Sequence, residues 1–351
     1  MKSILVTGGA GFIGSHTCVT LLEKGYELYV IDSYVNSYPT SLKRVIELVS
    51  KKDKSLSRNL NVFEGDLRDS NLLQSIFDKS RENGNPIDSV IHFAGIKSVA
   101  QSILDPISYW DSNLIGTICL INTMNQNNCH EIVFSSSATI YGNTDREKIT
   151  EDALIKPVNP YGITKMSIEK FLRNVYDSCQ EKWKIANLRY FNPIGAHSSS
   201  LIGEYPKGEP NNIFPYINNV ASGDLLSLSI FGNDWPTADG TGVRDYIHVM
   251  DLAEGHIRSL EFLKNNKPQF LNLNMGTGKG TSVLELIKTF EEVNKVRIPF
   301  TFGERRSGDV AKLIADNSLL KLILNWEPKR TLEEMCKDGW KWQSQNPLGY
   351  K

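Results

Sequence analysis

The most restrictive feature of this 351-residue chain lies near its start, where an apolar strand runs directly into a glycine-rich turn. The run 4–6 is typical of a buried parallel strand. Gly8, Gly11 and Gly14 follow it with the spacing G-x-x-G-x-x-G, and Gly9 adds an overlapping G-x-G-x-x-G. Such glycines let the backbone approach a pyrophosphate at the positive N-terminus of the next helix, expected over 11–24. The sequence therefore predicts a dinucleotide-binding turn.

A second predicted strand, 27–31, ends in Asp32, at the distance expected for a residue that binds a ribose 2′-hydroxyl. No basic residue follows before Lys43, so a 2′-phosphate would find no cationic partner there. It would also be repelled by the carboxylate of Asp32. These residues favour NAD over NADP as the cofactor.

The first half of the chain alternates apolar strands with helical patterns, which predicts an α/β fold with a Rossmann-type, doubly wound parallel sheet. Further strands are expected at 61–63, 89–93, 131–134 and 185–190, and helices at 113–127 and 165–180. Beyond residue 192, Gly and Pro become frequent, as in 203–210. We expect an NAD-binding domain over 1–190 and a smaller α/β substrate-binding domain over 191–351, with some later segments returning to the first domain.

Composition gives no support for several classes of partner. The formal net charge of −1 gives no electrostatic reason to expect nucleic acid or an anionic membrane as a partner. Five scattered cysteines, without a C-x-x-C pair, are typical of reduced thiols in a cytoplasm and indicate no metal site. No apolar run reaches membrane-spanning length, and the first residues lead directly into a predicted strand, so we expect no signal or anchor segment. We expect a cytoplasmic protein.

Two polar segments are expected at the carboxyl ends of the strands, where parallel sheets bind their ligands. One contains Ser137, and the other contains Tyr161 and Lys165, which share one helix face. The spacing Y-x-x-x-K carries little information alone, and a surface helix with a Tyr–Lys contact would explain it too. Its position in a dinucleotide fold favours catalysis, because Lys165, an oxidised nicotinamide and a Ser137 hydroxyl would stabilise the Tyr161 phenolate. That requires lowering a tyrosine pKa by about three units, worth roughly 4 kcal/mol.

Together these residues resemble the extended short-chain dehydrogenase/reductase family and, within it, the UDP-glucose 4-epimerases. The resemblance runs nearly end to end and is carried by the segments 6–17, 90–95, 134–142, 188–193, 210–212 and 230–249. The last segment, from Ile230 to Val249, is the most specific, because generic reductases lack it.

The resemblance implies a reaction that interconverts UDP-galactose and UDP-glucose. Tyr161 would take the proton of the sugar 4-hydroxyl while NAD takes the C4 hydride, and Ser137 would hydrogen-bond the same oxygen. Lys165 would lower the tyrosine pKa and hold the nicotinamide ribose. The 4-keto sugar would then turn and receive the hydride on its other face, so NAD would stay bound throughout.

The resemblance also implies the residues that contact each ligand. The NAD site would be lined by Gly8, Gly11, Phe12, Ile13, Gly14, Asp32, Ser33, Asn36, Ser37, Asp66, Leu67, Phe93, Ala94, Gly95, Lys97, Asn113, Ser137, Tyr161, Lys165 and Phe191. The UDP sugar would be held by Ser137, Tyr161, Asn192, Asn212, Ile213, Ser229, Ile230, Phe231, Arg244, Arg306, Asp309 and Leu313. Arginines suit this role, because a planar guanidinium grips diphosphate oxygens in pairs.

Two positions depart from the family pattern. Leu313 stands where many bacterial relatives carry a tyrosine, at a gate beside the sugar 2-substituent. Leucine is of intermediate bulk, so acceptance of N-acetylated UDP-hexosamines is open. Ser33 replaces a usual Asn after Asp32, which we expect to be tolerated. The family is usually homodimeric; Leu114, Ile118 and Ile121 would supply such an interface, although core packing explains their spacing equally well.

Three alternatives remain at this point. A nucleotide-sugar 4,6-dehydratase shares the fold, NAD, Tyr and Lys, but needs an acidic pair where this chain has Ala138 and Thr139. A UDP-glucuronate epimerase or decarboxylase would need a further basic residue for the substrate carboxylate. A non-catalytic NAD-binding regulator could dispense with Ser137, Tyr161 and Lys165, all of which this chain retains.

Overall fold

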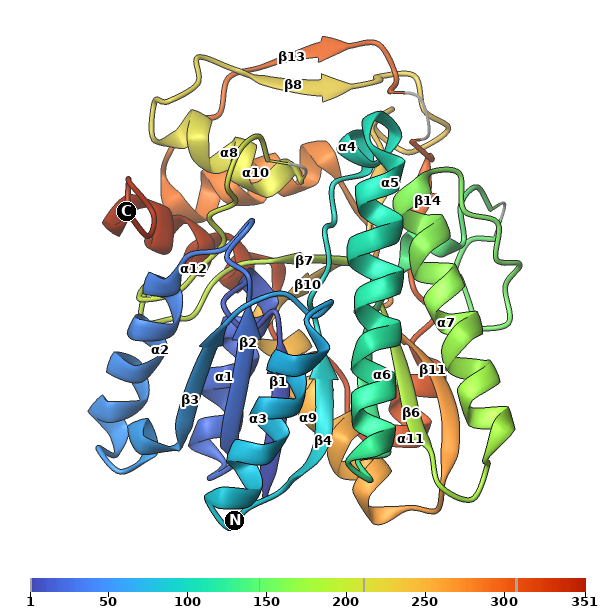
Figure 1. Ribbon diagram of the computed structural model, residues 1–351. Helices are drawn as coiled ribbons and strands as arrows, with labels where there is room; N and C mark the ends of the chain where they lie inside the picture. The colour runs from blue at the N-terminus through green and yellow to red at the C-terminus, as the bar shows by residue number, and fades with distance from the viewer. Residues whose placement is uncertain (1, 145, 211, 307–308) are drawn as a thin grey trace.

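A computed structural model describes residues 2–144, 146–210, 212–306 and 309–351. Its centre is a parallel sheet of seven strands in the order β11-β6-β5-β4-β1-β2-β3 (Figure 1). The strands are β1 (Ser3–Thr7), β2 (Glu27–Asp32), β3 (Leu60–Glu64), β4 (Ile87–His92), β5 (Glu131–Ser137), β6 (Lys184–Tyr190) and β11 (Gln269–Met275). The order reverses between β1 and β4, which is where open α/β sheets bind their ligands. The predicted doubly wound sheet is confirmed.

Helices cover both faces of this sheet. One layer is formed by α1 (Phe12–Glu23), α2 (Pro39–Lys52) and α9 (Val249–Asn265), and the other by α3 (Ser70–Glu82), α6 (Gly116–Gln126) and α7 (Pro160–Ser178). Alternate residues of β1 serve the two layers: Ile4 and Val6 pack into the first core, and Leu5 packs into the second. A strand buried on both faces is a continuous apolar run, which is why β1 was readable from the sequence.

β11 and α9 lie beyond residue 190, yet one is an edge strand of the large sheet and the other packs on α1. Helix α11 (Ser318–Leu324) packs against β11. Later segments therefore return to the sheet, while the domain boundary near residue 190 stays a prediction. Among the described residues, no helix combines the length and the apolar character needed to cross a membrane.

A smaller layer lies across the carboxyl ends of the strands, at the top of Figure 1. Its apolar core joins α8 (Ile213–Ala221), α10 (Val283–Asn294) and α12 (Leu332–Gln345) with β8 (Leu228–Phe231), which pairs with β13 (Phe300–Gly303). Short strands connect this layer to the sheet: β7 (Asn192–Ile194) pairs with β10 (Tyr246–His248), and β9 (Val243–Arg244) pairs with β12 (Thr281–Ser282) and β14 (Lys312–Leu313).

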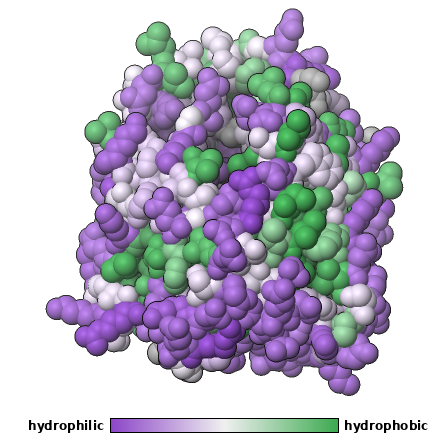
Figure 2. All heavy atoms as spheres, viewed as in Figure 1, coloured by the Kyte–Doolittle hydropathy of each residue, from purple (hydrophilic) through white to green (hydrophobic). Residues whose placement is uncertain are grey.

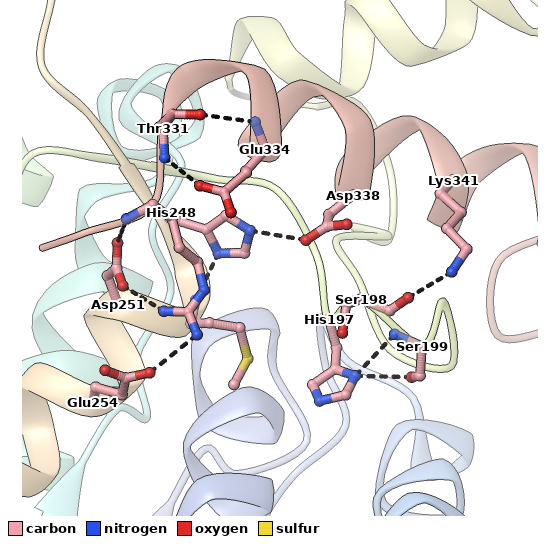
Figure 3. Close-up of polar contacts among 12 residues, drawn as sticks. His197, Ser198, Ser199, His248, Asp251, Glu254, Thr331, Glu334, Asp338 and Lys341 are labelled. Atoms are coloured by element: carbon pink, nitrogen blue, oxygen red, sulfur yellow. Dashed lines mark hydrogen bonds and ion pairs between the residues drawn. The ribbon is translucent and has the colours of Figure 1, made fainter. Parts of the chain in front are cut away.

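Helix α12 and the residues just before it are held to the start of α9 by polar and charged groups (Figure 3). Asp251 accepts hydrogen bonds from the backbone of Lys329 (3.0 Å) and Arg330 (2.8 Å) and pairs with the Arg330 guanidinium, which also contacts Glu254 at 3.1 Å. His248 faces Asp338 of α12 at 3.4 Å. These contacts hold the smaller layer against the sheet.

Most of the remaining short elements follow the carboxyl ends of strands, while one lies at the amino end of β3. The sequence after β4 forms α4 (Val99–Leu104), α5 (Pro106–Tyr109) and a π-helical turn, η2 (Trp110–Ile115), which continues into α6. Two 3₁₀ turns complete the set, η1 (Leu56–Asn59) before β3 and η3 (Ala138–Ile140) after β5.

Candidate active site

The glycine turn has no room for a side chain at Gly8 or Gly14. Gly8 has φ +69°, and a Cβ there would lie 2.7 Å from the Ala94 nitrogen. A Cβ on Gly14 would lie 2.3 Å from the Gly8 carbonyl oxygen. Helix α1 then begins after Gly11 without a side-chain cap, so its first amides are left for an outside acceptor. This arrangement fits a pyrophosphate at the helix N-terminus.

Asp32 joins the glycine turn to the loop after β2. Its carboxylate accepts hydrogen bonds from the Ala10 amide (2.9 Å), the Tyr34 amide (2.9 Å) and the Ser37 hydroxyl (2.7 Å). The acidic group is therefore fixed at the carboxyl end of β2, as predicted for a ribose-binding residue.

Asp66 lies at the corresponding end of the neighbouring strand β3. Hydrogen bonds from Arg68 lower the pKa of the Asp66 carboxyl, and the same guanidinium pairs with Asp111 in η2. Leu67 beside it is buried. The structure thus places these residues along one rim of the ligand edge.

The segment after β4 completes the other side. The Ala94 amide donates to the Thr7 hydroxyl at 3.2 Å, which ties this segment to β1. Asn113 binds both backbone groups of Ile96, accepting at 2.9 Å and donating at 3.1 Å. Lys97 pairs with Glu204 at 3.3 Å. The residues predicted on β1, β2 and β4 therefore gather at the switch point of the sheet.

Ser137, Tyr161 and Lys165 come together at the carboxyl end of β5. Helix α7 begins at Pro160, and the Asn159 side chain caps it by accepting the Gly162 amide at 2.8 Å. Tyr161 therefore lies in the first turn and Lys165 in the second. The Lys165 ammonium lies 5.9 Å from the Tyr161 ring centroid and donates to the Ser135 carbonyl at 2.7 Å. Ser137 hydrogen-bonds to Tyr161.

Burial controls the ionisation of these groups. It raises the pKa of Tyr161 to about 12, although the Ser137 hydrogen bond opposes the shift. It lowers the pKa of Lys165 to about 7, opposed by the charge of Glu169. For the protein's residues by themselves, desolvation therefore outweighs the Ser137 hydrogen bond in setting the pKa of Tyr161. The expectation that Lys165 and an oxidised nicotinamide together lower this pKa stays a prediction.

Asn192, one of the residues predicted to bind the UDP sugar, has a side-chain oxygen without a hydrogen-bond partner among the described residues. Its backbone amide donates to the Asp245 carbonyl at 3.0 Å, which fixes it in β7. Its side-chain oxygen Oδ1 is buried and has no hydrogen-bond partner. Buried acceptors in proteins are nearly always paired, so this oxygen is suited to a donor on a ligand.

Arginines supply positive charge nearby. Arg244 is mostly buried and donates to the carbonyls of Val243 and Val310, both at 2.9 Å, while its nearest carboxylate, Asp309, lies 4.0 Å away. Burial lowers the pKa of this guanidinium. Arg306 pairs with Asp309 at 3.1 Å and lies over the Phe231 ring at 4.6 Å. One carboxylate does not neutralise two guanidiniums, which leaves this group of side chains suited to an anion.

The other residues predicted to bind the substrate differ in whether their side chains are exposed. Ser229 and Phe231 are exposed on β8, but Ile230 between them points into the core of the smaller layer. Its side chain therefore cannot contact a ligand, because alternate residues of a strand face opposite sides. Asn212 and Ile213 lie at the start of α8, where the Asn212 side chain forms no cap.

Leu313 lies between the two halves of the site. In β14 it is opposite Arg244 in the ladder with β9. Its half-buried side chain packs against the apolar cluster that contains Phe191 and Tyr141. The residue thus borders both the predicted NAD side and the predicted sugar side.

Sequence reasoning missed the ion pair beneath this site. Arg189 and Glu169 are both buried and lie 2.7 Å apart. The signal was present in the sequence, because Arg189 falls within the strand expected at 185–190. Strands of a parallel sheet are buried on both faces, and an arginine buried there requires a partner. Glu169, one turn after Lys165 on the same helix, was the available carboxylate.

The dinucleotide turn and the Ser137–Tyr161–Lys165 group share one sheet edge, which is the arrangement of extended short-chain dehydrogenases/reductases. A family model described as GDP-mannose 4,6 dehydratase matches residues 5–339. The chain is 50% identical over 349 residues, covering 99% of both chains, to the UDP-glucose 4-epimerase of Bacillus subtilis (strain 168).

Solved structures agree with this result. The fold matches a UDP-glucose 4-epimerase from Stenotrophomonas maltophila, determined with bound NAD and formylated UDP-arabinopyranose, with a TM-score of 0.93 and 43% identity, covering 99% of each chain. It matches the enzyme from Bifidobacterium longum in complex with NAD⁺ and UDP with a TM-score of 0.90 and 43% identity, covering 99% and 100% of the two chains. The chain therefore belongs to the UDP-glucose 4-epimerase family.

Proposed function

We propose that this protein is an NAD-dependent UDP-glucose 4-epimerase that interconverts UDP-galactose and UDP-glucose. The observation that carries the proposal is the meeting of Ser137, Tyr161 and Lys165 beside a glycine turn that fits a pyrophosphate. The full-length identity to UDP-glucose 4-epimerases supports it. The residues after Ser137 argue against the dehydratase alternative, because Ala138 and Thr139 stand where an acidic pair would be needed.

The residues of the chain fit NAD and a UDP sugar. The uncapped amides of α1 and the carboxylate of Asp32 would hold the pyrophosphate and a ribose. Arg244 and Arg306 would grip the diphosphate of the substrate, and Asn192 would accept a hydrogen bond through its unpartnered oxygen. When bound, NAD supplies a hydride acceptor for C4 and a positive charge near the phenol.

Proton transfer is assigned to Tyr161. Its phenolic oxygen would accept the proton of the sugar 4-hydroxyl and later return it, while Ser137 hydrogen-bonds the same region. Because burial alone raises the pKa of Tyr161 to about 12, the phenolate depends on added positive charge and on the Ser137 hydrogen bond. Lys165 provides the protein's own cation at this point.

The test is an assay of the purified protein with UDP-galactose and no added NAD. We expect UDP-glucose to form to a fixed ratio, and Tyr161→Phe to lose most turnover while NAD remains bound. Near-normal turnover in that variant would contradict the role of Tyr161. A 4-keto-6-deoxy product would show dehydration instead. UDP-N-acetylgalactosamine in the same assay tests whether Leu313 leaves room for a bulkier 2-substituent.

The proposal includes a homodimer. Apolar side chains are exposed along α4, α5 and η2, among them Ile103, Leu104 and Ile107, and Figure 2 shows apolar surface gathered over α6 and α7. A groove of about 580 Å³ lies between those two helices, lined by Ile118 and Phe171 among others. A second copy would cover this surface.

The three residues expected at such an interface are placed differently from one another. Ile118 is partly exposed, Leu114 packs partly against the core, and Ile121 is a core residue. Core packing therefore explains Ile121. For the location we propose the cytoplasm, because all five cysteines are free.

A further inference from the structure

A chain of buried polar groups lies beneath the catalytic strand end, between β5, β6 and α7. Glu169 lies on α7 one helical turn after Lys165 and accepts a hydrogen bond from the Ser136 hydroxyl, next to Ser137. Arg189 of β6 donates to both of its carboxylate oxygens, at 3.0 and 2.7 Å. The exposed fractions of Glu169 and Arg189 are only 5% and 1%.

The polar groups on the other side of Arg189 are also hydrogen-bonded. Arg189 donates to the Tyr141 hydroxyl and to the Glu151 carbonyl, both at 2.9 Å, and Tyr141 donates to Asn274 at 2.7 Å. Stability alone gives a weak reason for such a pair, because apolar side chains of similar volume often fill the same space at no loss. The position of the Glu169–Arg189 pair next to Lys165 gives a stronger reason for its presence.

Few charged groups act on Lys165. On α7 it faces Tyr161 and Glu169, and on β5 it faces the Ser135 carbonyl and the Phe134 ring, 4.8 Å away. On β4 it faces His92, which burial keeps neutral by lowering its pKa to about 3. Within the described part of the chain, Glu169 is the one carboxylate that favours the charged form of Lys165.

We propose that Glu169, held by Arg189, is a positioning residue for the epimerase reaction: it keeps Lys165 cationic and ties the strand end at Ser136 and Ser137 to helix α7. The inference rests on the proposed function. It explains why the Glu169 carboxylate is buried next to the catalytic residues, although burying a charge is unfavourable. It also explains why Lys165 keeps part of its charge at neutral pH, although burial lowers its pKa to about 7.

The test is Glu169→Gln, which keeps the shape of the side chain and removes its charge. The readout is the ultraviolet absorbance of the Tyr161 phenolate against pH in the holoenzyme, taken as a difference from the Tyr161→Phe background. Without Glu169, Lys165 loses its positive charge more easily, which raises the pKa of Tyr161. Removing the Glu169 carboxylate itself would lower that pKa, but this effect is smaller because the carboxylate is more distant and paired with Arg189. We therefore expect the phenolate titration to move to higher pH and kcat at pH 7 to fall about tenfold per pKa unit, with KM little changed.

Controls separate this charge effect from damage to the fold. Glu169→Asp restores the charge and should recover much of the loss, whereas Lys170→Gln, on the exposed face of α7, should match wild type. If Glu169→Gln does not fold, Glu169→Met combined with Arg189→Met removes both charges together and should show the same titration shift.

An unchanged phenolate titration and kcat in a folded Glu169 variant would overturn the inference. This outcome is distinct from failure of the proposed function. A wild-type protein that does not epimerise UDP-galactose contradicts the function, while the phenolate titration still decides the effect of Glu169.

Discussion

At the residue scale, Gly14 is fixed by space rather than by side-chain chemistry. A Cβ there would lie 2.3 Å from the Gly8 oxygen, so Gly14→Ala must push α1 away from the turn. We expect this variant to lose its bound NAD and to be destabilised by about 1–3 kcal/mol, as in other overpacked sites. NAD released from the denatured protein and a thermal unfolding curve measure both effects.

The matched control is Gly303→Ala in β13, where the nearest atom to a new Cβ is 3.8 Å away. It should keep its NAD and its melting temperature. A Gly14→Ala protein that retains NAD as well as this control would show that the turn tolerates a side chain.

Ser137 controls the ionisation of Tyr161. Its hydrogen bond is the one contribution that lowers the pKa of a tyrosine otherwise raised by burial to about 12. Ser137→Ala should therefore raise the tyrosine pKa, so that less phenolate exists at any pH below it. The rising limb of kcat against pH should move to higher pH, with about a tenfold loss at pH 7 for each pKa unit.

Ser178→Ala at the far end of α7 is the control, since that hydroxyl only donates to the Val175 carbonyl. The pH profile of the control should coincide with that of the wild type. If Ser137→Ala lowers kcat equally at every pH, the serine acts on the substrate and not on the tyrosine pKa.

At the scale of elements, the sequence predicts best where a strand is buried on both faces. The apolar runs that became β1, β4, β5 and β6 were all readable, because their sequence pattern is local. The two-residue strands β9, β12 and β14 were not, since no periodicity exists over two residues and only tertiary pairing defines them.

The features of the candidate site also divide into those set by local sequence patterns and those set by tertiary contacts. The glycine turn and the spacing of Tyr161 and Lys165 are local patterns, and both could be read from the sequence. The pairing of Glu169 with Arg189 and the opposition of Leu313 to Arg244 join segments distant in the chain, so only the structure reveals them. The high pKa of Tyr161 likewise depends on how deeply tertiary packing buries it.

The contacts of Asp251 that join α9 to the residues before α12, called the clamp here, provide a prediction at the scale of elements (Figure 3). Asp251 is buried and accepts two backbone amides as well as the Arg330 guanidinium. Asp251→Ala leaves these donors unpaired and should lower the free energy of unfolding by about 2–3 kcal/mol in a denaturant titration. Glu254→Ala removes a more exposed partner of the same arginine and should lower it by less than about 1 kcal/mol. Equal losses would mean that the burial of Asp251 adds nothing to the clamp.

At the scale of the whole molecule, the exposed apolar face of α4, α5 and η2 lies on the same side as the groove between α6 and α7. Ile107 and Leu104 are 80% and 78% exposed in the single chain, so they contribute little to its core. Large apolar surfaces of this kind mark interaction sites in folded proteins. A second copy is the partner that our proposed function assigns to it.

Ile107→Glu tests this assembly. A charge at so exposed a position should change the stability of the single chain by no more than about 0.5 kcal/mol. Buried in an interface without a partner, the same carboxylate is strongly unfavourable. We expect sedimentation or light scattering to give a dimer mass for the wild type and a monomer mass for Ile107→Glu. Leu322→Glu on α11, a leucine that is also 78% exposed, should remain dimeric. A dimer that survives Ile107→Glu with unchanged affinity would place the interface on another face.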